Sequence, residues 1–182
     1  IFSAANSIKS QYPQIPIVVL TPFSKEVTRR MAGADLSNID YMFSWLGNSD
    51  LLLAIIKIIE DKLNAPDDMQ SVGVQAILLV EDSVRFYSSA LPCLYKIVLE
   101  QSRKFSTEAL NDHLKMLRMR GRPKVLLARS YEEAMEILQA YPNNILGVVS
   151  DMDYSYQGSK HPQAGLILAQ EILKDHPHLP FI

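Results

Sequence analysis

Two pairs of acidic residues stand just after apolar runs of the chain. Glu81 and Asp82 directly follow one such run, and Asp151 and Asp153 follow another, nearer the C-terminus. Carboxylates that crowd together repel one another and raise each other's pKa, and a hard divalent cation such as Mg²⁺ relieves that repulsion. A cation beside a carboxylate nucleophile suits phosphoryl transfer, because it neutralises charge on the transferred oxygens. The four acids therefore indicate a metal site with phosphoryl chemistry.

The acids must be positioned by the elements around them. Continuous apolar or β-branched runs predict strands over residues 15–20, 40–43, 76–80, 125–128, 145–149 and 179–182. Capped and periodic stretches predict helices over residues 24–32, 49–63, 86–99, 107–119, 131–141 and 164–174. Strands that alternate with helices predict an α/β fold in which helices cover both faces of a parallel sheet.

The order of the strands decides whether the two acid pairs meet. In a flavodoxin-like sheet the strands predicted at 76–80 and 145–149 are neighbours, and functional residues gather at the carboxyl ends of such strands. We therefore expect Glu81, Asp82 and Asp151 to share one edge of the sheet. The alternative is that each acid caps the helix that follows it, or lies solvated at a loop end.

The chain begins and ends with the same kind of sequence. The matching positions are Ala5 with Ala169, Ile8 with Ile172, Pro13 with Pro177, and Pro16 with Pro180. Internal similarity of this kind indicates a tandem protein. We interpret residues 1–65 as the C-terminal half of a first domain and 66–73 as a linker. Residues 74–182 are then the N-terminal part of a second domain of the same type, with a helical insertion near 100–124.

Composition narrows the classes of partner. A net charge of −2 over 182 residues gives no general attraction to nucleic acids or anionic membranes. The most apolar run, 51–59, contains Lys57 and is too short to span a bilayer. We expect a cytoplasmic protein that neither enters membranes nor binds nucleic acid. Cys93 is the only cysteine and lies in an apolar stretch, so we expect a buried thiol.

Taken in order, these motifs resemble the receiver domains of bacterial response regulators. Glu81 and Asp82 match the family's acidic pair after strand one, and Asp151 matches its phospho-accepting aspartate after strand three. Asp153 matches the position that offers a metal its backbone carbonyl. Thr21 matches the hydroxyl residue at the end of strand four. The resemblance covers nearly the whole chain apart from the insertion.

The resemblance implies a doubly wound, flavodoxin-like sheet of five parallel strands. It also implies a phospho-accepting module of two-component or phosphorelay signalling rather than an enzyme, although such a module could remove its own phosphoryl group. A histidine kinase or a phosphotransfer protein would phosphorylate Asp151. Mg²⁺ would be held by Glu81, Asp82, Asp151 and Asp153.

The first half departs from the family pattern. Ser44 and Trp45 stand where the family has a lysine followed by proline, so the charge that pairs with the phosphoryl group is missing there. The permuted order of strands could still close into one receiver, with Thr21 supplying a hydroxyl to the site of Asp151. Two molecules could instead exchange halves or form a homodimer. We favour self-association, because half-domains leave sheet edges open.

Two other functions compete with the signalling hypothesis. A pseudo-receiver would use the same fold as a protein-interaction scaffold, and Ser44 favours this for the first half. The segment Asp151-Met-Asp153 also resembles the nucleophile motif of haloacid-dehalogenase-like phosphatases, but that family has no acidic pair upstream of it.

The insertion near 100–124 is rich in basic residues. We expect a helical hairpin with its basic face in solvent rather than a docking surface for an acidic partner or nucleic acid, because no aromatic residues interleave for base stacking. Its stretch Leu117-Arg-Met-Arg-Gly-Arg-Pro123 also weakly resembles regulatory regions attached to phosphoenolpyruvate synthase-like proteins, from which no activity is carried over.

Overall fold

The computed structural model describes residues 2–22, 37–45, 47–107 and 121–182. The elements of the N-terminal part are α1 (Phe2–Gln11), β1 (Val18–Pro22), β2 (Tyr41–Trp45), α3 (Asp50–Ala65) and the short π-helix η1 (Pro66–Ser71). Those of the C-terminal part are β3 (Ala76–Val80), α4 (Val84–Thr107), β4 (Lys124–Ala128), α6 (Tyr131–Ala140), β5 (Ile145–Ser150), β6 (Tyr154–Tyr156), β7 (Ser159–His161) and α7 (Ala164–Asp175).

The strands confirm the α/β class. In the C-terminal part β3 lies between β4 and β5 and pairs with both in parallel, in the order β4-β3-β5. The strands β1 and β2 form a separate two-stranded parallel sheet, and β6 and β7 form an antiparallel hairpin. The described residues therefore contain a sheet of three parallel strands and one of two, where the receiver resemblance implied a doubly wound sheet of five.

The last residues of the chain lie beside β5. Val148 forms a parallel bridge with Phe181, and its N–H donates to the carbonyl oxygen of Pro180 at 2.9 Å. Ile182 returns a hydrogen bond to the carbonyl of Val148 at 3.0 Å. This is the beginning of the strand predicted over 179–182, and it places that segment on the far side of β5 from β3.

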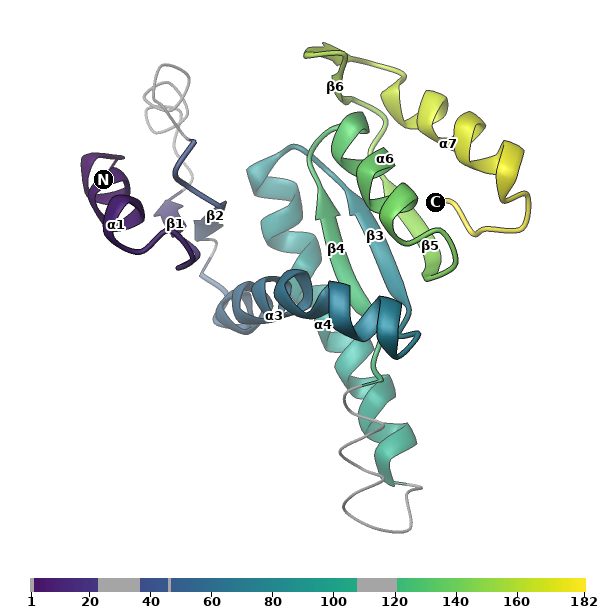
Figure 1. Ribbon diagram of the computed structural model, residues 1–182, viewed down its shortest axis with the longest axis horizontal. Coiled ribbons are helices and arrows are strands. Elements are labelled where there is room, and N and C mark those ends of the chain that lie inside the picture. The colour runs from purple at the N-terminus through teal and green to yellow at the C-terminus, as the bar shows by residue number, and fades with distance from the viewer. Residues whose placement is uncertain (1, 23–36, 46, 108–120) are drawn as a thin grey trace.

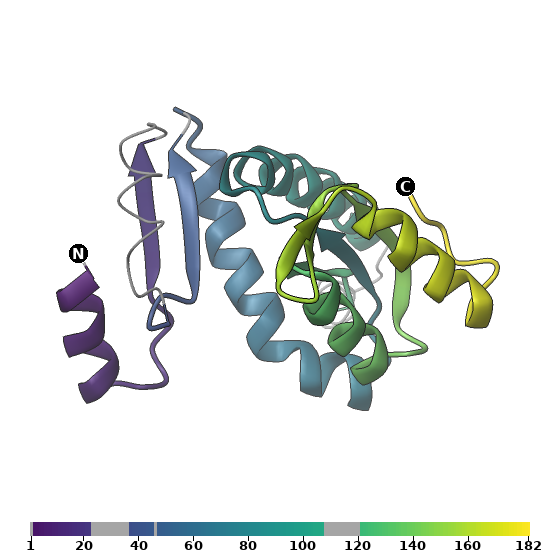
Figure 2. The ribbon, with the colours of Figure 1, turned by 90° about the horizontal axis from the view of Figure 1, so that it is seen from above.

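Helices cover both faces of the three-stranded sheet (Figures 1 and 2). On one face α6 and α7 pack on alternate residues of the strands, with Leu78, Val80 and Val148 at the centre. On the opposite face α4 packs on Leu79 and Val125. This alternation is the period-two geometry of strands buried on both sides.

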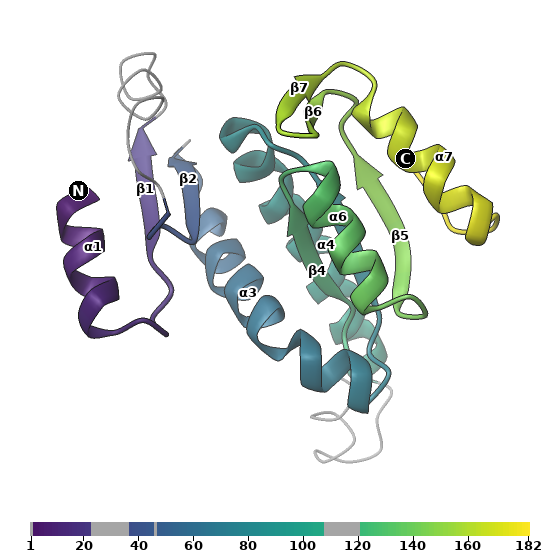
Figure 3. The same cartoon turned by 45° about the horizontal axis from the view of Figure 1, so that its top comes forward.

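Helix α3 joins the two parts of the molecule. It lies along the edge strand β4, between the three-stranded sheet and the β1–β2 sheet (Figure 3). Its residues Leu51, Ala54 and Ile58 are buried in the same cluster as Phe43 of β2 and Tyr87 of α4. The N-terminal half is therefore packed onto the C-terminal half through a shared apolar core.

The segment 66–73, predicted to be a linker, continues α3 as a π-helical turn. Its Met69 side chain is buried, and Asp68 forms an ion pair with Lys124 at 2.6 Å. The chain leaves this turn at Gly73, whose φ of +78° favours glycine. An extended connection would have let the first half reach β5, whereas this helical one holds it at the β4 edge.

A buried ionic network fixes α3 to the start of β4. The carboxylate of Asp61 is 0 % exposed and accepts hydrogen bonds from Arg122 at 2.6 Å, from the Tyr95 hydroxyl at 2.9 Å and from the Val125 N–H at 2.9 Å. Burial alone would lower the pKa of Arg122, but the hydrogen bonds and charge of Asp61 raise it. The sequence prediction of a solvated basic face was wrong for Arg122 and Lys124, which are both buried.

Several boundaries differ from the predictions. Helix α4 extends to Thr107, eight residues beyond its predicted end, and Ser102 continues its buried face past that end. The prediction of a buried thiol was wrong, since Cys93 points to solvent from α4. The predicted helices at 24–32 and 107–119 lie almost wholly outside the described residues.

None of the helices within the described ranges is long and apolar enough to cross a membrane.

Candidate functional site

The acid pairs meet at one edge of the three-stranded sheet. The register places Val80 of β3 opposite Ser150 of β5, so the residues that follow leave the two strands side by side. The N–H of Asp151 donates to the carbonyl of Val80 at 2.9 Å, and that of Glu81 donates to Ala128 at the same distance. The prediction that these strands are neighbours is confirmed. We call this the acid edge, formed by Glu81, Asp82, Asp151 and Asp153.

Ionisation of the carboxyl groups at the acid edge is disfavoured, because the acids lie close to one another and are partly buried. Partial burial and the charges of Asp151 and Asp82 raise the pKa of Glu81, against a hydrogen bond from the Ser83 N–H at 2.9 Å. Partial burial and the charges of Asp151 and Asp153 likewise raise the pKa of Asp82. Like charges that share a site destabilise one another's ionised form, so a cation bound among them would be stabilised.

A lysine that sequence reasoning missed lies among these acids. The Nζ of Lys160 is 3.8 Å from the Oδ2 of Asp82 and 3.8 Å from the Oδ2 of Asp153. Its charge lowers the pKa of both Glu81 and Asp82, opposing the effect of burial. The lysine therefore supplies part of the positive charge that the acid edge requires.

Lys160 reaches the acids because its segment forms the β6–β7 hairpin. Gln157 and Gly158 both have positive φ, of 52° and 76°, as a two-residue primed turn requires. Lys160 pairs with Ser155 across the hairpin, on the face opposite Tyr154 and His161. The alternating run Tyr154-Ser-Tyr156 directly before Gln157-Gly158 was a signal for this hairpin in the sequence.

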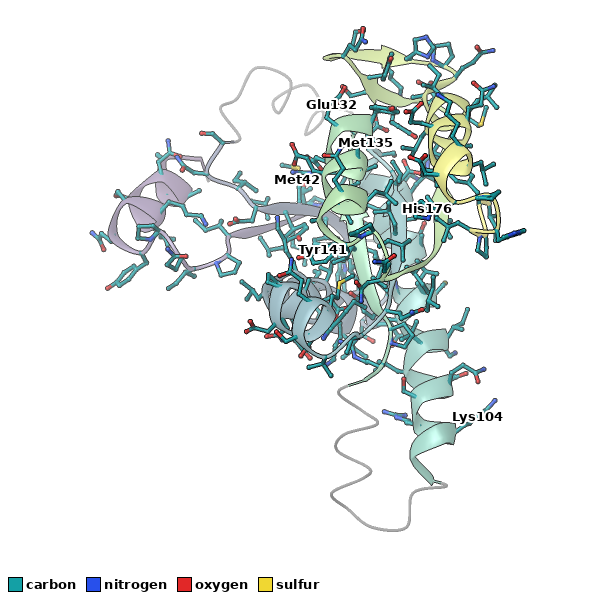
Figure 4. All side chains as sticks on the ribbon, turned by 45° about the vertical axis from the view of Figure 1, so that its right-hand side comes forward. Met42, Lys104, Glu132, Met135, Tyr141 and His176 are labelled. Carbon is teal, nitrogen blue, oxygen red and sulfur yellow. The ribbon has the colours of Figure 1, made fainter. Side chains whose placement is uncertain are left out.

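Contacts with α6 hold the hairpin in place. The N–H of Gln157 donates to Glu132 at 2.8 Å, and Figure 4 shows Glu132 at the end of α6 nearest the hairpin. The ring of Tyr156 packs edge-on against Tyr131 at 4.9 Å. Helix α6 itself begins as predicted, with Ser130 accepting from the N–H of Glu133 at 3.1 Å. These contacts with α6 fix the position of the hairpin strand from which the Lys160 side chain extends.

The backbone at Asp151 is fixed by close packing. Gly165, in the first turn of α7, lies so near that a Cβ there would overlap the carbonyl oxygen of Asp151 and come within 3.1 Å of the Met152 Cα. The N–H of Gly165 also donates to the Met152 carbonyl at 3.1 Å. One carboxylate oxygen of Asp151 accepts from the Met152 N–H at 2.7 Å.

The donor set at the acid edge fits Mg²⁺ in its chemistry. Carboxylate oxygens are the hard ligands that this ion prefers, and the raised pKa values of Glu81 and Asp82 reflect a repulsion that the ion would relieve. Among the residues that the structure describes, however, no three or more His, Cys, Asp or Glu side chains lie close enough together to hold a metal ion. Metal binding therefore requires the acid side chains to move closer to one another.

The structure does not bring Thr21 to the acid edge. The residue lies in β1, on the far side of α3 from β5 (Figure 3), and its hydroxyl donates to the adjacent Pro22 carbonyl at 3.1 Å. The composite site, in which Thr21 completes the site of Asp151, is therefore not formed in this arrangement. The helical connection at 66–71 and the segment 180–182 beside β5 are the physical reasons.

Ser44, where the receiver resemblance led us to expect a lysine, is a packing residue. It is 1 % exposed, and its N–H donates to the hydroxyl of Ser88 in α4 at 2.9 Å. Its own hydroxyl is, within the described ranges, the buried side-chain polar group that lacks a hydrogen-bond partner. The neighbouring Tyr87 hydroxyl donates to the Met42 carbonyl. The carboxyl end of β2 thus docks on the first turns of α4.

Ser44→Ala should leave the free energy of unfolding unchanged or slightly higher, because it removes an unpaired buried hydroxyl. Ser88→Ala should lower it by about 1–2 kcal/mol, because the Ser44 N–H loses its acceptor. Urea unfolding followed by circular dichroism measures both. A larger loss for Ser44→Ala than for Ser88→Ala would contradict the assignment of Ser44 as an unpaired group.

Comparison with known proteins adds no relative. No family model matches the chain, and neither the curated proteins nor the solved structures that were compared with it include a match.

Proposed function

We propose that residues 74–182 form a phospho-accepting receiver module of a two-component or phosphorelay protein, in which Asp151 is the phosphoacceptor. The observation that carries the proposal is the convergence of the two acid pairs at the carboxyl ends of the adjacent strands β3 and β5. The order β4-β3-β5, followed by 180–182, is also compatible with a flavodoxin-like sheet. A full receiver has five parallel strands, two more than the three in the order β4-β3-β5.

The chemistry gives Asp151 the role of nucleophile and all four acids a share in holding a metal ion. An oxygen of the Asp151 carboxylate attacks the phosphorus of a phosphohistidine or a small acyl phosphate. The new O–P bond forms as the donor's N–P or O–P bond breaks, and the leaving imidazole or carboxylate departs with the electron pair. Bound Mg²⁺ would neutralise charge on the transferred oxygens. Glu81, Asp82, Asp151 and the backbone carbonyl of Asp153 would hold it.

The experiment is a search for the phosphoryl group by intact-mass spectrometry. With Mg²⁺ and a small acyl phosphate or a histidine-phosphorylated donor, the chain should gain one phosphoryl group. Asp151→Asn should abolish the gain, because an amide is not a nucleophile, whereas Asp175→Asn at the exposed end of α7 should retain it.

Two results would contradict the proposal. One is the absence of a mass gain with a donor that labels another receiver in the same assay. The other is steady turnover of a simple phosphate ester, which would favour the phosphatase hypothesis instead. If the mass gain appears, the cognate kinase or phosphotransfer protein would be sought by transfer from radiolabelled donors.

For residues 2–65 we propose a scaffold role rather than a second phosphorylation site. Burial of Ser44 against α4 favours this, because a lysine at that position would leave a charge in the core shared by β2, α3 and α4. Cytoplasmic location and self-association through exchange of halves remain predictions. Light scattering at several concentrations measures the self-association.

A further inference from the structure

We propose that Lys160 is the built-in counter-ion of the acid edge, and that a divalent cation binds there by displacing its ammonium group. The inference rests on the proposed function, because it concerns the same four acids. It adds a residue that lies outside the motifs of the receiver resemblance. It also predicts that this residue tunes how tightly the metal binds.

The geometry places one positive charge between two acid pairs. The Nζ of Lys160 is at the same distance, 3.8 Å, from a carboxylate oxygen of Asp82 and from one of Asp153. These two acids come from different strand ends, after β3 and after β5. Each distance allows an ion pair but is longer than a direct charge-assisted hydrogen bond. The ammonium is therefore shared between them rather than committed to either.

The hairpin fixes the backbone position of Lys160 relative to the acid edge. Lys160 is the middle residue of β7, and the hairpin is anchored to α6 by Glu132 and by the packing of Tyr131 and Tyr156. Ser130 also bridges to Ser155, the residue directly opposite Lys160. The side chain itself is 62 % exposed, so its tip can leave the acids without unfolding the hairpin.

A metal and the lysine compete for the same charges. A divalent ion among Glu81, Asp82 and Asp151 would stand within a few ångströms of a like-charged ammonium, and two positive groups at that distance repel. The lysine can relieve this repulsion by turning into solvent, where a long charged side chain is readily accommodated. Loss of its charge should thus make metal binding tighter.

The test is a titration with Mg²⁺ alone, measured by isothermal titration calorimetry at low ionic strength. Lys160→Gln should bind Mg²⁺ about three- to tenfold more tightly than the wild type. Lys160→Arg, which keeps the charge, should bind like the wild type. Lys174→Gln is the matched control, because Lys174 is similarly exposed, at 66 %, and pairs with Glu171 on α7.

The outcomes separate this inference from the proposed function, because the titration needs no phosphodonor. Equal or weaker affinity in Lys160→Gln would overturn the counter-ion role, and so would the absence of Mg²⁺ binding in both proteins. If the affinity rises as expected but no donor phosphorylates Asp151, the counter-ion role stands and the proposed signalling function falls.

Discussion

Asp61→Ala should lower the free energy of unfolding by about 3–5 kcal/mol, the cost of breaking a buried ion pair from one side. The Asp61 carboxylate is 0 % exposed and accepts from Arg122, Tyr95 and the N–H of Val125. Its removal leaves a guanidinium that is 6 % exposed with only the more exposed and more distant carboxylate of Glu60, at 3.6 Å. Urea unfolding followed by circular dichroism should show a lower midpoint with little change in slope.

A double variant separates the buried charge from simple loss of packing. Asp61→Leu combined with Arg122→Met replaces both charges by apolar groups, and it should recover much of the lost stability. Asp175→Ala, which removes an exposed acid, should change the free energy of unfolding by less than about 0.5 kcal/mol. A cost below about 1 kcal/mol for Asp61→Ala would mean that water reaches this network in solution.

Gly165→Ala should destabilise the protein by about 1–3 kcal/mol, although alanine favours helices by about 1 kcal/mol. The added Cβ would overlap the carbonyl oxygen of Asp151, and backbone on both sides has to move to make room. Because the displaced residue is the proposed phosphoacceptor, phosphorylation by a small donor should also slow. Thermal unfolding and intact-mass time courses measure the two effects.

Gln170→Ala, on the exposed side of the same helix, tests the propensity contribution alone and should be neutral or slightly stabilising. If Gly165→Ala behaved like Gln170→Ala in both assays, the tight contact between α7 and residues 151–152 would not hold in solution. A loss of stability without slower phosphorylation would separate the packing role from the acceptor's position.

The strands and the acid edge followed from local patterns. The run 76–80 is apolar throughout and is bounded by a turn and an acid pair, and β3 has those bounds. The convergence of Glu81 with Asp151 needed only the assumption that β3 and β5 are neighbours, which their pairing confirms. The strand positions are encoded within a few residues of each strand, whereas the convergence also rested on the flavodoxin-like order of strands.

The remaining features depend on contacts between distant segments. In the sequence, Asp61 looks like an ordinary polar residue of an amphipathic helix. Its role depends on Arg122, which is 61 positions further along the chain and contacts it only in the folded protein. Lys160 likewise looks like an ordinary surface charge in the sequence, and only the hairpin brings it near Asp82 and Asp153. The choice between a closed, permuted receiver and a separate β1–β2 sheet was likewise not predictable, because it depends on how the segment 66–71 is folded.

The helical connection between α3 and β3 has a consequence for how such chains can change in length. Each residue added to a helical segment rotates everything beyond it, by about 100° in an α-helix and by somewhat less in a π-helical turn such as η1. An insertion between Ala65 and Ser71 would swing Asp61 away from Arg122, and it would turn the face that presents Ile58 out of the core. The rotational phase between the two halves is therefore set by residue count, and tolerated insertions there should come in whole turns.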